Sequence, residues 1–171
     1  MAQLDGLGLA AFNSLPTDEA EGALMACCTS RRWARLVLDG RPYPSDDAVY
    51  RAADSALAEL AEPDIDEALA GHPRIGERPS AGHSEWSNQE QAGVASVESS
   101  TNAALAEANR AYEQRFGHVY LVCATGKNAD ELLAILNDRL RNDPATERQV
   151  VRSELGKINR LRLERIFAEG T

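Results

Sequence analysis

The amino-acid sequence predicts an all-α fold, a single-domain bundle of several helices that occupies residues 1–171. Apolar residues recur at helical spacing in successive segments, and capping residues, prolines and glycines stand where the helices should begin and end. Only residues 118–125, HVYLVCAT, are rich in side chains that favour an extended backbone. A chain of this length is also large enough to bury one hydrophobic core.

The first half of the chain is predicted to hold helices up to Gly71. Polar residues at 17–19 open the first helix, and the Ser-Asp-Asp sequence at 45–47 caps the third. Pro63 stands near the start of the fourth, and Gly71 closes it. These helices are expected at about residues 17–28, 29–40, 45–60 and 63–71.

The second half is predicted to be helical except at its centre. The β-like run at 118–125 has no obvious partner strand, so we expect a buried extended segment rather than part of a sheet. Pro144 stands at the first position of the last helix, where a proline is well tolerated. The helices are expected from about Ser87 onward and at residues 98–117, 128–143 and 144–167.

The net charge of the chain excludes some classes of partner. The formal charge is −9 at pH 7 and the sequence pI is about 4.8. Nucleic acids and anionic membranes would be repelled by such a surface, so neither is expected as a partner. No apolar run approaches the roughly 20 residues that span a bilayer. The N-terminus also lacks the basic region of a secretion signal.

The three cysteines, Cys27, Cys28 and Cys123, indicate neither a disulfide framework nor a structural zinc site. Two of them are adjacent, their number is odd, and no C-x-x-C spacing occurs. We therefore expect small buried thiols and a reducing, cytoplasmic environment.

One arginine stands on an apolar face of the last predicted helix. The residues that form this face are Val151, Leu155, Ile158 and Ile166. Arg162 lies four residues after Ile158 and four before Ile166, in the middle of this apolar face. A buried guanidinium needs a partner, which is either a polar group of the core or an anionic or carbonyl-rich ligand. Arg139 lies only at the edge of its helix's apolar face and is expected to be the weaker candidate.

Residues 71–93, GHPRIGERPSAGHSEWSNQEQAG, carry many functional groups and little to bury. His72 follows a helix end, where a histidine serves either as a partner of the helix dipole or as an acid–base group. Ser87 and Glu90 form an S-x-x-E pattern that fits a capping box, although this carboxylate could also orient a histidine. A metal site built from His72, His83 and Glu90 is disfavoured, because zinc-binding helices usually carry ligands at i and i+4.

Six motifs in chain order, taken together, resemble the 2-oxo-4-hydroxy-4-carboxy-5-ureidoimidazoline (OHCU) decarboxylase family. They are FNSLPTDEA…CCTSRRWARLVLDGRPY, HPRIGE, SNQEQAG, RFGHVYLVCATGK, LNDRLRND…E and KINRLRL. The resemblance covers about residues 12–167. Each motif alone is weak, and six of them in register are specific.

The resemblance implies an all-helical carboxy-lyase that needs no cofactor and no metal. Its substrate would be OHCU and its product (S)-allantoin, at the last step from urate. A homodimer is the common state in the family. Functional coupling to 5-hydroxyisourate hydrolase, the upstream enzyme, is a further expectation.

The resemblance also implies roles for individual residues. His72 matches the proposed acid–base histidine of the family, with Pro73 beside it, and Glu90 matches the carboxylate that orients this histidine. Arg162 matches a substrate-binding arginine. The other matched substrate-binding positions are Ser87, Gln91, Phe116, Gly117, His118 and Val119.

The chain departs from the family pattern at the extended segment. Many members have F-G-F-P-F there, whereas this chain has FGHVYL, so His118 and Val119 replace an aromatic residue and a proline. HPRIG likewise replaces the frequent HPDLG. Two other functions remain open alternatives: a non-catalytic helical module that binds a small molecule or a protein, and a metal-dependent hydrolase.

Overall fold

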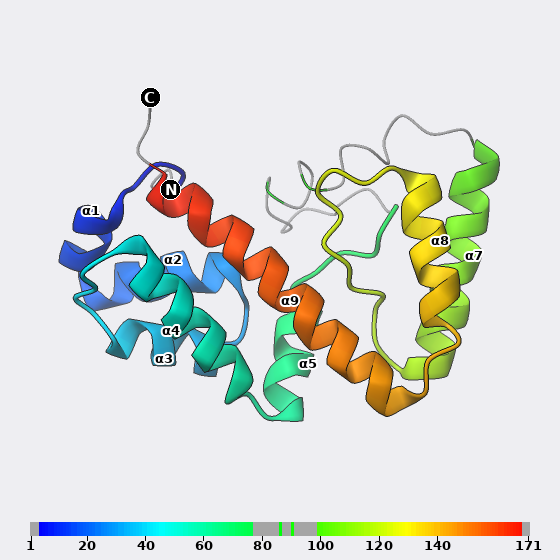
Figure 1. Cartoon of the computed structure of the whole chain (residues 1–171), viewed down its shortest axis with the longest axis horizontal. Helices are drawn as coiled ribbons and strands as arrows, with labels where there is room; N and C mark the ends of the chain where they lie inside the picture. The colour runs from blue at the N-terminus through cyan, green and yellow to red at the C-terminus, as the bar shows by residue number, and fades with distance from the viewer. Residues whose placement is uncertain (1–3, 77–85, 87–89, 91–98, 169–171) are drawn as a thin grey trace. The chain divides into compact units, whose positions relative to one another are not determined.

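The structure is a computed structural model, and it describes residues 4–76, 86, 90 and 99–168. Every regular element in these ranges is a helix, and none of them is a strand, which confirms the predicted all-α fold (Figure 1). Trp86 and Glu90 are also helical. The helices are α1 (Leu9–Ser14), α2 (Thr17–Cys27), α3 (Arg31–Asp39), α4 (Asp46–Ala58), α5 (Glu62–Ala70), α7 (Ser99–Phe116), α8 (Ala129–Arg139) and α9 (Pro144–Phe167).

The chain divides into two compact units. Unit 1 comprises residues 1–68 and 156–171, and unit 2 comprises residues 69–155. The first half of α9 therefore belongs to unit 2 and its second half to unit 1. The single-domain organisation stays a prediction. Across the described ranges, no helix combines the length and the apolar character needed to cross a membrane.

Serine caps fix the helix starts in unit 1 where the sequence predicted them. The Ser30 hydroxyl accepts a hydrogen bond from the Trp33 amide at 3.3 Å, and the Ser45 hydroxyl accepts one from the Ala48 amide at 3.2 Å. Trp33 is fully buried, and its indole N–H donates to the Ala53 carbonyl of α4 at 3.1 Å. α3 packs between α2 and α4 as a result.

The short helix α1 is absent from the sequence-based prediction. It has only six residues, and its first flanking residue, Gly8, offers no capping side chain. Its stability comes from tertiary contacts: Phe12 is fully buried and meets Phe167 edge-on at 5.3 Å. The backbone amide of Gly8 also donates to the Ile166 carbonyl of α9 at 3.0 Å. Such contacts leave no periodic signal in a six-residue segment.

Unit 2 is built around α7, α8 and the extended segment between them. Residues 120–124 are buried without forming a strand, which confirms the prediction for this segment. Gly117 ends α7 with a φ of 79°, a conformation that favours glycine, so the chain can leave the helix here. The apolar core of the unit consists of Ile75, Leu105, Tyr112, Tyr120, Val122, Ala124, Ala129, Leu132 and Leu136.

Candidate functional site

The turn that contains His72 and Pro73 follows α5 in unit 2. The backbone amide of His72 donates to the Leu69 carbonyl at 3.0 Å, and both His72 and Pro73 are half-buried. The next residue, Arg74, forms an ion pair with Glu113 of α7, with N–O distances of 2.5 and 3.1 Å. The turn is therefore anchored on both sides of the histidine.

A buried asparagine adds a further anchor to this turn. The Asn109 amide group of α7 donates to the Ile75 carbonyl at 2.9 Å, and Asn109 is only 4% exposed. Arg74 and Ile75 are thus both bonded to side chains of α7. Because α7 is a long helix in the same unit, it gives the histidine turn a rigid support.

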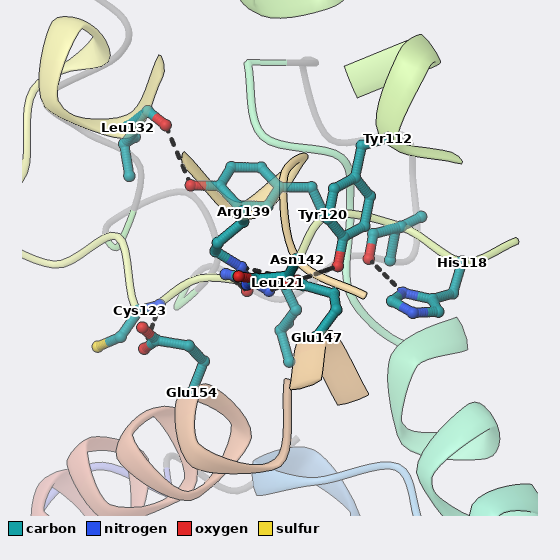
Figure 2. Close-up of polar contacts among 11 residues, drawn as sticks. Tyr112, His118, Tyr120, Leu121, Cys123, Leu132, Arg139, Asn142, Glu147 and Glu154 are labelled. Atoms are coloured by element: carbon teal, nitrogen blue, oxygen red, sulfur yellow. Dashed lines mark hydrogen bonds and ion pairs between the residues drawn. The ribbon is translucent and has the colours of Figure 1, made fainter. Parts of the chain in front are cut away.

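The four predicted substrate-binding residues Phe116–Val119 form the turn at the C-terminal end of α7. The Gly117 amide donates to the Glu113 carbonyl at 2.8 Å. The His118 ring stacks on Phe116 with an interplanar angle of 27°, and its Nδ1 lies 3.1 Å from the Val119 carbonyl oxygen (Figure 2). α7 therefore contacts both predicted parts of the site. Its residues Asn109 and Glu113 bond to the turn that contains His72, and its C-terminus continues into the turn at residues 116–119.

Side chains from α8, from α9 and from the loop before α8 hold the extended segment by its backbone. The Arg139 guanidinium donates to the Leu121 carbonyl at 2.6 Å, and the Cys123 amide donates to a Glu154 carboxylate oxygen at 3.3 Å (Figure 2). The Lys127 ammonium group donates to the Cys123 carbonyl at 3.0 Å. Backbone polar groups that no neighbouring strand satisfies are thus paired with side chains.

Behind this segment lies a buried polar network that the sequence analysis did not anticipate. Glu147, in the first turn of α9, is fully buried and accepts hydrogen bonds from the Tyr112 hydroxyl, the Asn142 amide group at 3.0 Å and Arg139 Nε at 2.7 Å (Figure 2). Arg139 also lies 4.9 Å from the centre of the Tyr120 ring. Each buried charge therefore has several partners.

The prediction that Arg139 lies at the edge of an apolar face was wrong. Arg139 is 5% exposed, which is close to the 4% of Arg162. It follows Leu132 and Leu136 at helical spacing, and all three are buried on the same side of α8. The helical spacing of these three residues was the sequence signal for the burial of Arg139. The partner that makes the burial possible, Glu147, comes from a different helix.

The tyrosines of this network remain hydrogen-bond donors rather than acids. Burial raises the pKa of Tyr112 far above its usual value, and the hydrogen bond to Glu147 raises it further. Burial also raises the pKa of Tyr120, although the Arg139 charge opposes it. For Arg139, burial lowers the pKa, but the hydrogen bond to Glu147, together with the electrostatic effects of Tyr112, Glu147 and Tyr120, raises it overall. Both tyrosines therefore stay protonated and Arg139 stays charged near neutral pH.

Glu90, the predicted orienting carboxylate, is half-buried, and its charge acts on a thiol of the extended segment. Burial raises the pKa of the Cys123 thiol, Lys127 lowers it, and the negative charge of Glu90 adds a small increase. Ser87, Gln91 and His83 lie outside the described residues.

Arg162 belongs to unit 1, where it is buried as its place on the apolar stripe predicted. Its exposed fraction is 4%, and its Nη1 donates to the Cys27 carbonyl at 3.1 Å. Cys27, Cys28 and Cys123 are buried free thiols, as predicted. A carbonyl partner does not decide between the two interpretations of Arg162, since a core guanidinium and a ligand-binding one can both donate to a main-chain oxygen.

No cluster of three or more histidine, cysteine or acidic residues suited to a metal ion occurs in the described ranges. The alternative metal site would need His72, His83 and Glu90. His72 and Glu90, which are also the predicted catalytic pair, are described, and His83 lies outside the described residues. The described polar groups instead form hydrogen-bonded and ion-paired contacts of the kinds given above.

The model of one protein family, OHCU decarboxylase, matches residues 13–164. A protein from Arabidopsis thaliana, "Uric acid degradation bifunctional protein TTL", is 30% identical over 148 residues, which are 84% of this chain and 46% of that protein. An OHCU decarboxylase from Haloferax volcanii is 25% identical over 95% of this chain and 97% of its own length. The chain thus spans less than half of the Arabidopsis relative and nearly all of the archaeal one.

The fold is similar to that of a solved OHCU decarboxylase whose crystal structure was determined in the presence of (S)-allantoin. The TM-score is 0.75 at 27% identity, and the match covers 85% of this chain and 96% of the other. With a family model that matches residues 13–164 and a solved member that shares the fold, the chain belongs to the OHCU decarboxylase family.

Proposed function

We propose that this protein is a carboxy-lyase that decarboxylates OHCU to (S)-allantoin in urate degradation. The observation that carries the proposal is the family match over residues 13–164, in which the matched motifs include HPRIGE, SNQEQAG and KINRLRL. The similarity to an OHCU decarboxylase crystallised with (S)-allantoin supports it.

The chemistry of the substrate explains why no cofactor is needed. OHCU carries a carboxylate and a hydroxyl on one ring carbon, next to a C=N bond. When the bond to the carboxylate breaks and CO2 leaves, its electron pair forms a C=C bond to the ureido-bearing carbon. The π electrons of the C=N bond move to the ring nitrogen, which takes up a proton. The hydroxyl proton is then lost to give a carbonyl, and a proton is added to the carbon that bears the ureido group. The protein must therefore hold the substrate and move protons.

His72 is proposed to relay the hydroxyl proton or to protonate the ureido-bearing carbon from one face. The anchored turn supports this role, because Arg74 and Ile75 fix the backbone directly after Pro73. A histidine can act as either acid or base near neutral pH. Protonation from one side accounts for an S product.

The other proposed residues bind and orient the substrate. Glu90 would orient His72, with Ser87 and Gln91 contacting the ureido arm. Arg162 would bind an anionic or carbonyl oxygen by charge-assisted hydrogen bonds. The turn at Phe116–Val119 would offer main-chain amides to ring or ureido oxygens, and the backbone contacts of Leu121 and Cys123 support it by fixing the segment that follows.

A homodimer in the cytoplasm is the proposed state of the protein. Coupling to a 5-hydroxyisourate hydrolase is a further proposal. It is supported by the relatives from Arabidopsis and Bacillus, whose names describe bifunctional proteins of uric acid degradation. Size-exclusion chromatography with light scattering would test the dimer.

The proposed activity is tested with OHCU generated in the cuvette from urate by urate oxidase and 5-hydroxyisourate hydrolase. We expect the OHCU absorbance to decay faster when this protein is added, and equally fast with EDTA present. The matched control is the His72→Gln variant at the same concentration, which should leave the decay near the spontaneous rate. Decay at the spontaneous rate with the wild-type protein would refute the activity, and loss of activity with EDTA would favour the metal-dependent alternative.

A further inference from the structure

Glu113 of α7 bonds to both turns of the candidate site, to one through its side chain and to the other through its main chain. Its carboxylate accepts two hydrogen bonds from the guanidinium of Arg74, at 2.5 Å from Nε and 3.1 Å from Nη2. Arg74 stands two residues after His72. The carbonyl oxygen of Glu113 accepts the Gly117 amide at 2.8 Å, in the turn at residues 116–119. One residue of unit 2 therefore connects the two turns.

The Arg74–Glu113 ion pair has a geometry that fixes orientation as well as distance. Two guanidinium nitrogens face the two oxygens of one carboxylate, which is the bidentate arrangement. The side chains are 48% and 23% exposed, so solvent screens the pair and its contribution to global stability is small. Its main effect should therefore be on the position of the turn. The frequent HPDLG form of the motif has an aspartate in place of Arg74, and an aspartate could not pair with Glu113.

A second bond attaches the same turn to α7. The Asn109 amide group donates to the Ile75 carbonyl at 2.9 Å. This bond should keep the turn on the helix when the ion pair is removed, but a single bond leaves the turn free to rotate about it. The ion pair supplies the second point of attachment, and it lies between that bond and His72 along the chain.

We propose that Arg74 and Glu113 are positioning residues for the reaction, because their ion pair fixes the turn of His72 relative to the turn at residues 116–119. This inference rests on the function proposed above, in which His72 moves a proton and main-chain amides of the second turn bind the substrate. Proton transfer requires the imidazole within hydrogen-bond reach of the reacting group. Displacement of a catalytic group by about 1 Å can lower the rate roughly 100-fold.

The two bonds of Glu113 predict a separation of kcat from KM. Substitution of its side chain removes the bonds to Arg74 and leaves its main-chain bond to Gly117 in place. The substrate-binding turn should keep its position, so KM should stay near that of wild type. The value of kcat should fall, because His72 is less well placed in the transition state. A merely structural role would lower Tm without changing the kcat of the folded molecules.

The experiment is a double-mutant cycle of Arg74→Ala, Glu113→Ala and the double variant, with kcat and KM measured for freshly generated OHCU. We expect kcat to fall about 10- to 100-fold in each single variant, with KM within about twofold of wild type. The double variant should lose no more than the single variants, because each substitution removes the same ion pair. The matched control, Glu164→Ala, breaks the exposed Arg160–Glu164 pair and should keep wild-type kcat.

Hydrogen exchange supplies a readout that does not depend on activity. The amides of His72 and of residues 74–76 should exchange faster in Glu113→Ala than in wild type, whereas those of residues 117–119 should keep their wild-type rates. If the alanine variant does not fold, Glu113→Gln takes its place, since it keeps the size of the side chain and removes the charge.

Three results would overturn the inference. They are a kcat within about twofold of wild type in the folded single variants, losses that multiply in the double variant, and unchanged exchange at the turn of His72. None of them would affect the proposed function, since the wild-type protein would still decarboxylate OHCU. An inactive wild-type protein would instead refute the proposed function, and the exchange rates would still show whether the ion pair holds the turn.

Discussion

His72 lies in a turn that is held by its backbone and by the residues that follow it. Its backbone amide bonds to the Leu69 carbonyl, and the residues after it are bonded to Glu113 and Asn109 of α7. Replacement of the imidazole should therefore leave the turn in place. Because these other contacts hold the turn, substitution of His72 is a suitable test of its catalytic role.

We expect His72→Gln to fold normally and to lose activity by roughly 10²–10⁴-fold, the usual contribution of a positioned acid–base group. Circular dichroism and Tm establish the fold, and the OHCU decay rate measures activity. Turnover near that of wild type would remove His72 from the mechanism.

Arg162→Ala should mainly weaken substrate binding. A guanidinium that holds the substrate equally in the ground state and the transition state contributes to KM rather than to kcat. Steady-state kinetics over a range of OHCU concentrations should give a raised KM. An unchanged KM and rate would assign Arg162 to the core alone, where it donates to the Cys27 carbonyl.

At the scale of elements, the extended segment is fixed by charged side chains of its helical neighbours. Arg139 of α8 bonds Leu121, Glu154 of α9 bonds Cys123, and Glu147 of α9 bonds Arg139. Two helices and a segment without regular structure therefore share one network. Loss of its central carboxylate should affect all three elements together.

We expect Glu147→Gln to lower the free energy of unfolding by about 3–5 kcal/mol, because it leaves the buried Arg139 charge without its counter-ion. The matched control is Glu164→Gln, which breaks the exposed Arg160–Glu164 pair and should cost less than about 1 kcal/mol. Urea unfolding monitored by circular dichroism measures both. Equal effects of the two substitutions would contradict the structural role of the network.

The start of α9 should be sensitive to acid through Asp143. The carboxylate accepts a hydrogen bond from the Thr146 amide at 2.8 Å, and its bonds to the amide and hydroxyl of Thr146 lower its pKa below the usual value. A lowered pKa contributes stability above the pKa of the unfolded chain, about 4, and that contribution disappears as the pH falls through the lower, folded pKa.

Asp143→Ala should therefore lower Tm at pH 7, and the difference from wild type should shrink as the pH falls below about 4. Thermal unfolding across this range measures both proteins. A difference in Tm that is independent of pH would show that the carboxylate charge is not what stabilises the helix start.

At the scale of the whole molecule, the features that follow from local sequence were predicted correctly. Serine caps at residues 30 and 45 and the glycine at 117 act within a few residues, so the helix boundaries and the extended segment could be inferred. The burial of Arg162 could also be inferred, because a single helix carries the whole apolar stripe.

Features that depend on packing between distant elements could not be predicted in the same way. Helix α1 is stabilised by contacts with α9, and Arg139 is buried because Glu147, Tyr112 and Leu121 supply partners from other elements. The roles of His72 and Glu90 came from the family resemblance, since residue spacing alone left a helix cap and a metal site open.

The most direct test of the proposed function is the handedness of the allantoin that forms. Spontaneous decay of OHCU gives racemic product, whereas a protein that protonates one face must give one enantiomer. Circular dichroism of the product, after OHCU generated in the cuvette has reacted with the wild-type protein, should develop the signal of (S)-allantoin. A product without circular dichroism, formed at the spontaneous rate, would contradict the assignment of this chain as an OHCU decarboxylase.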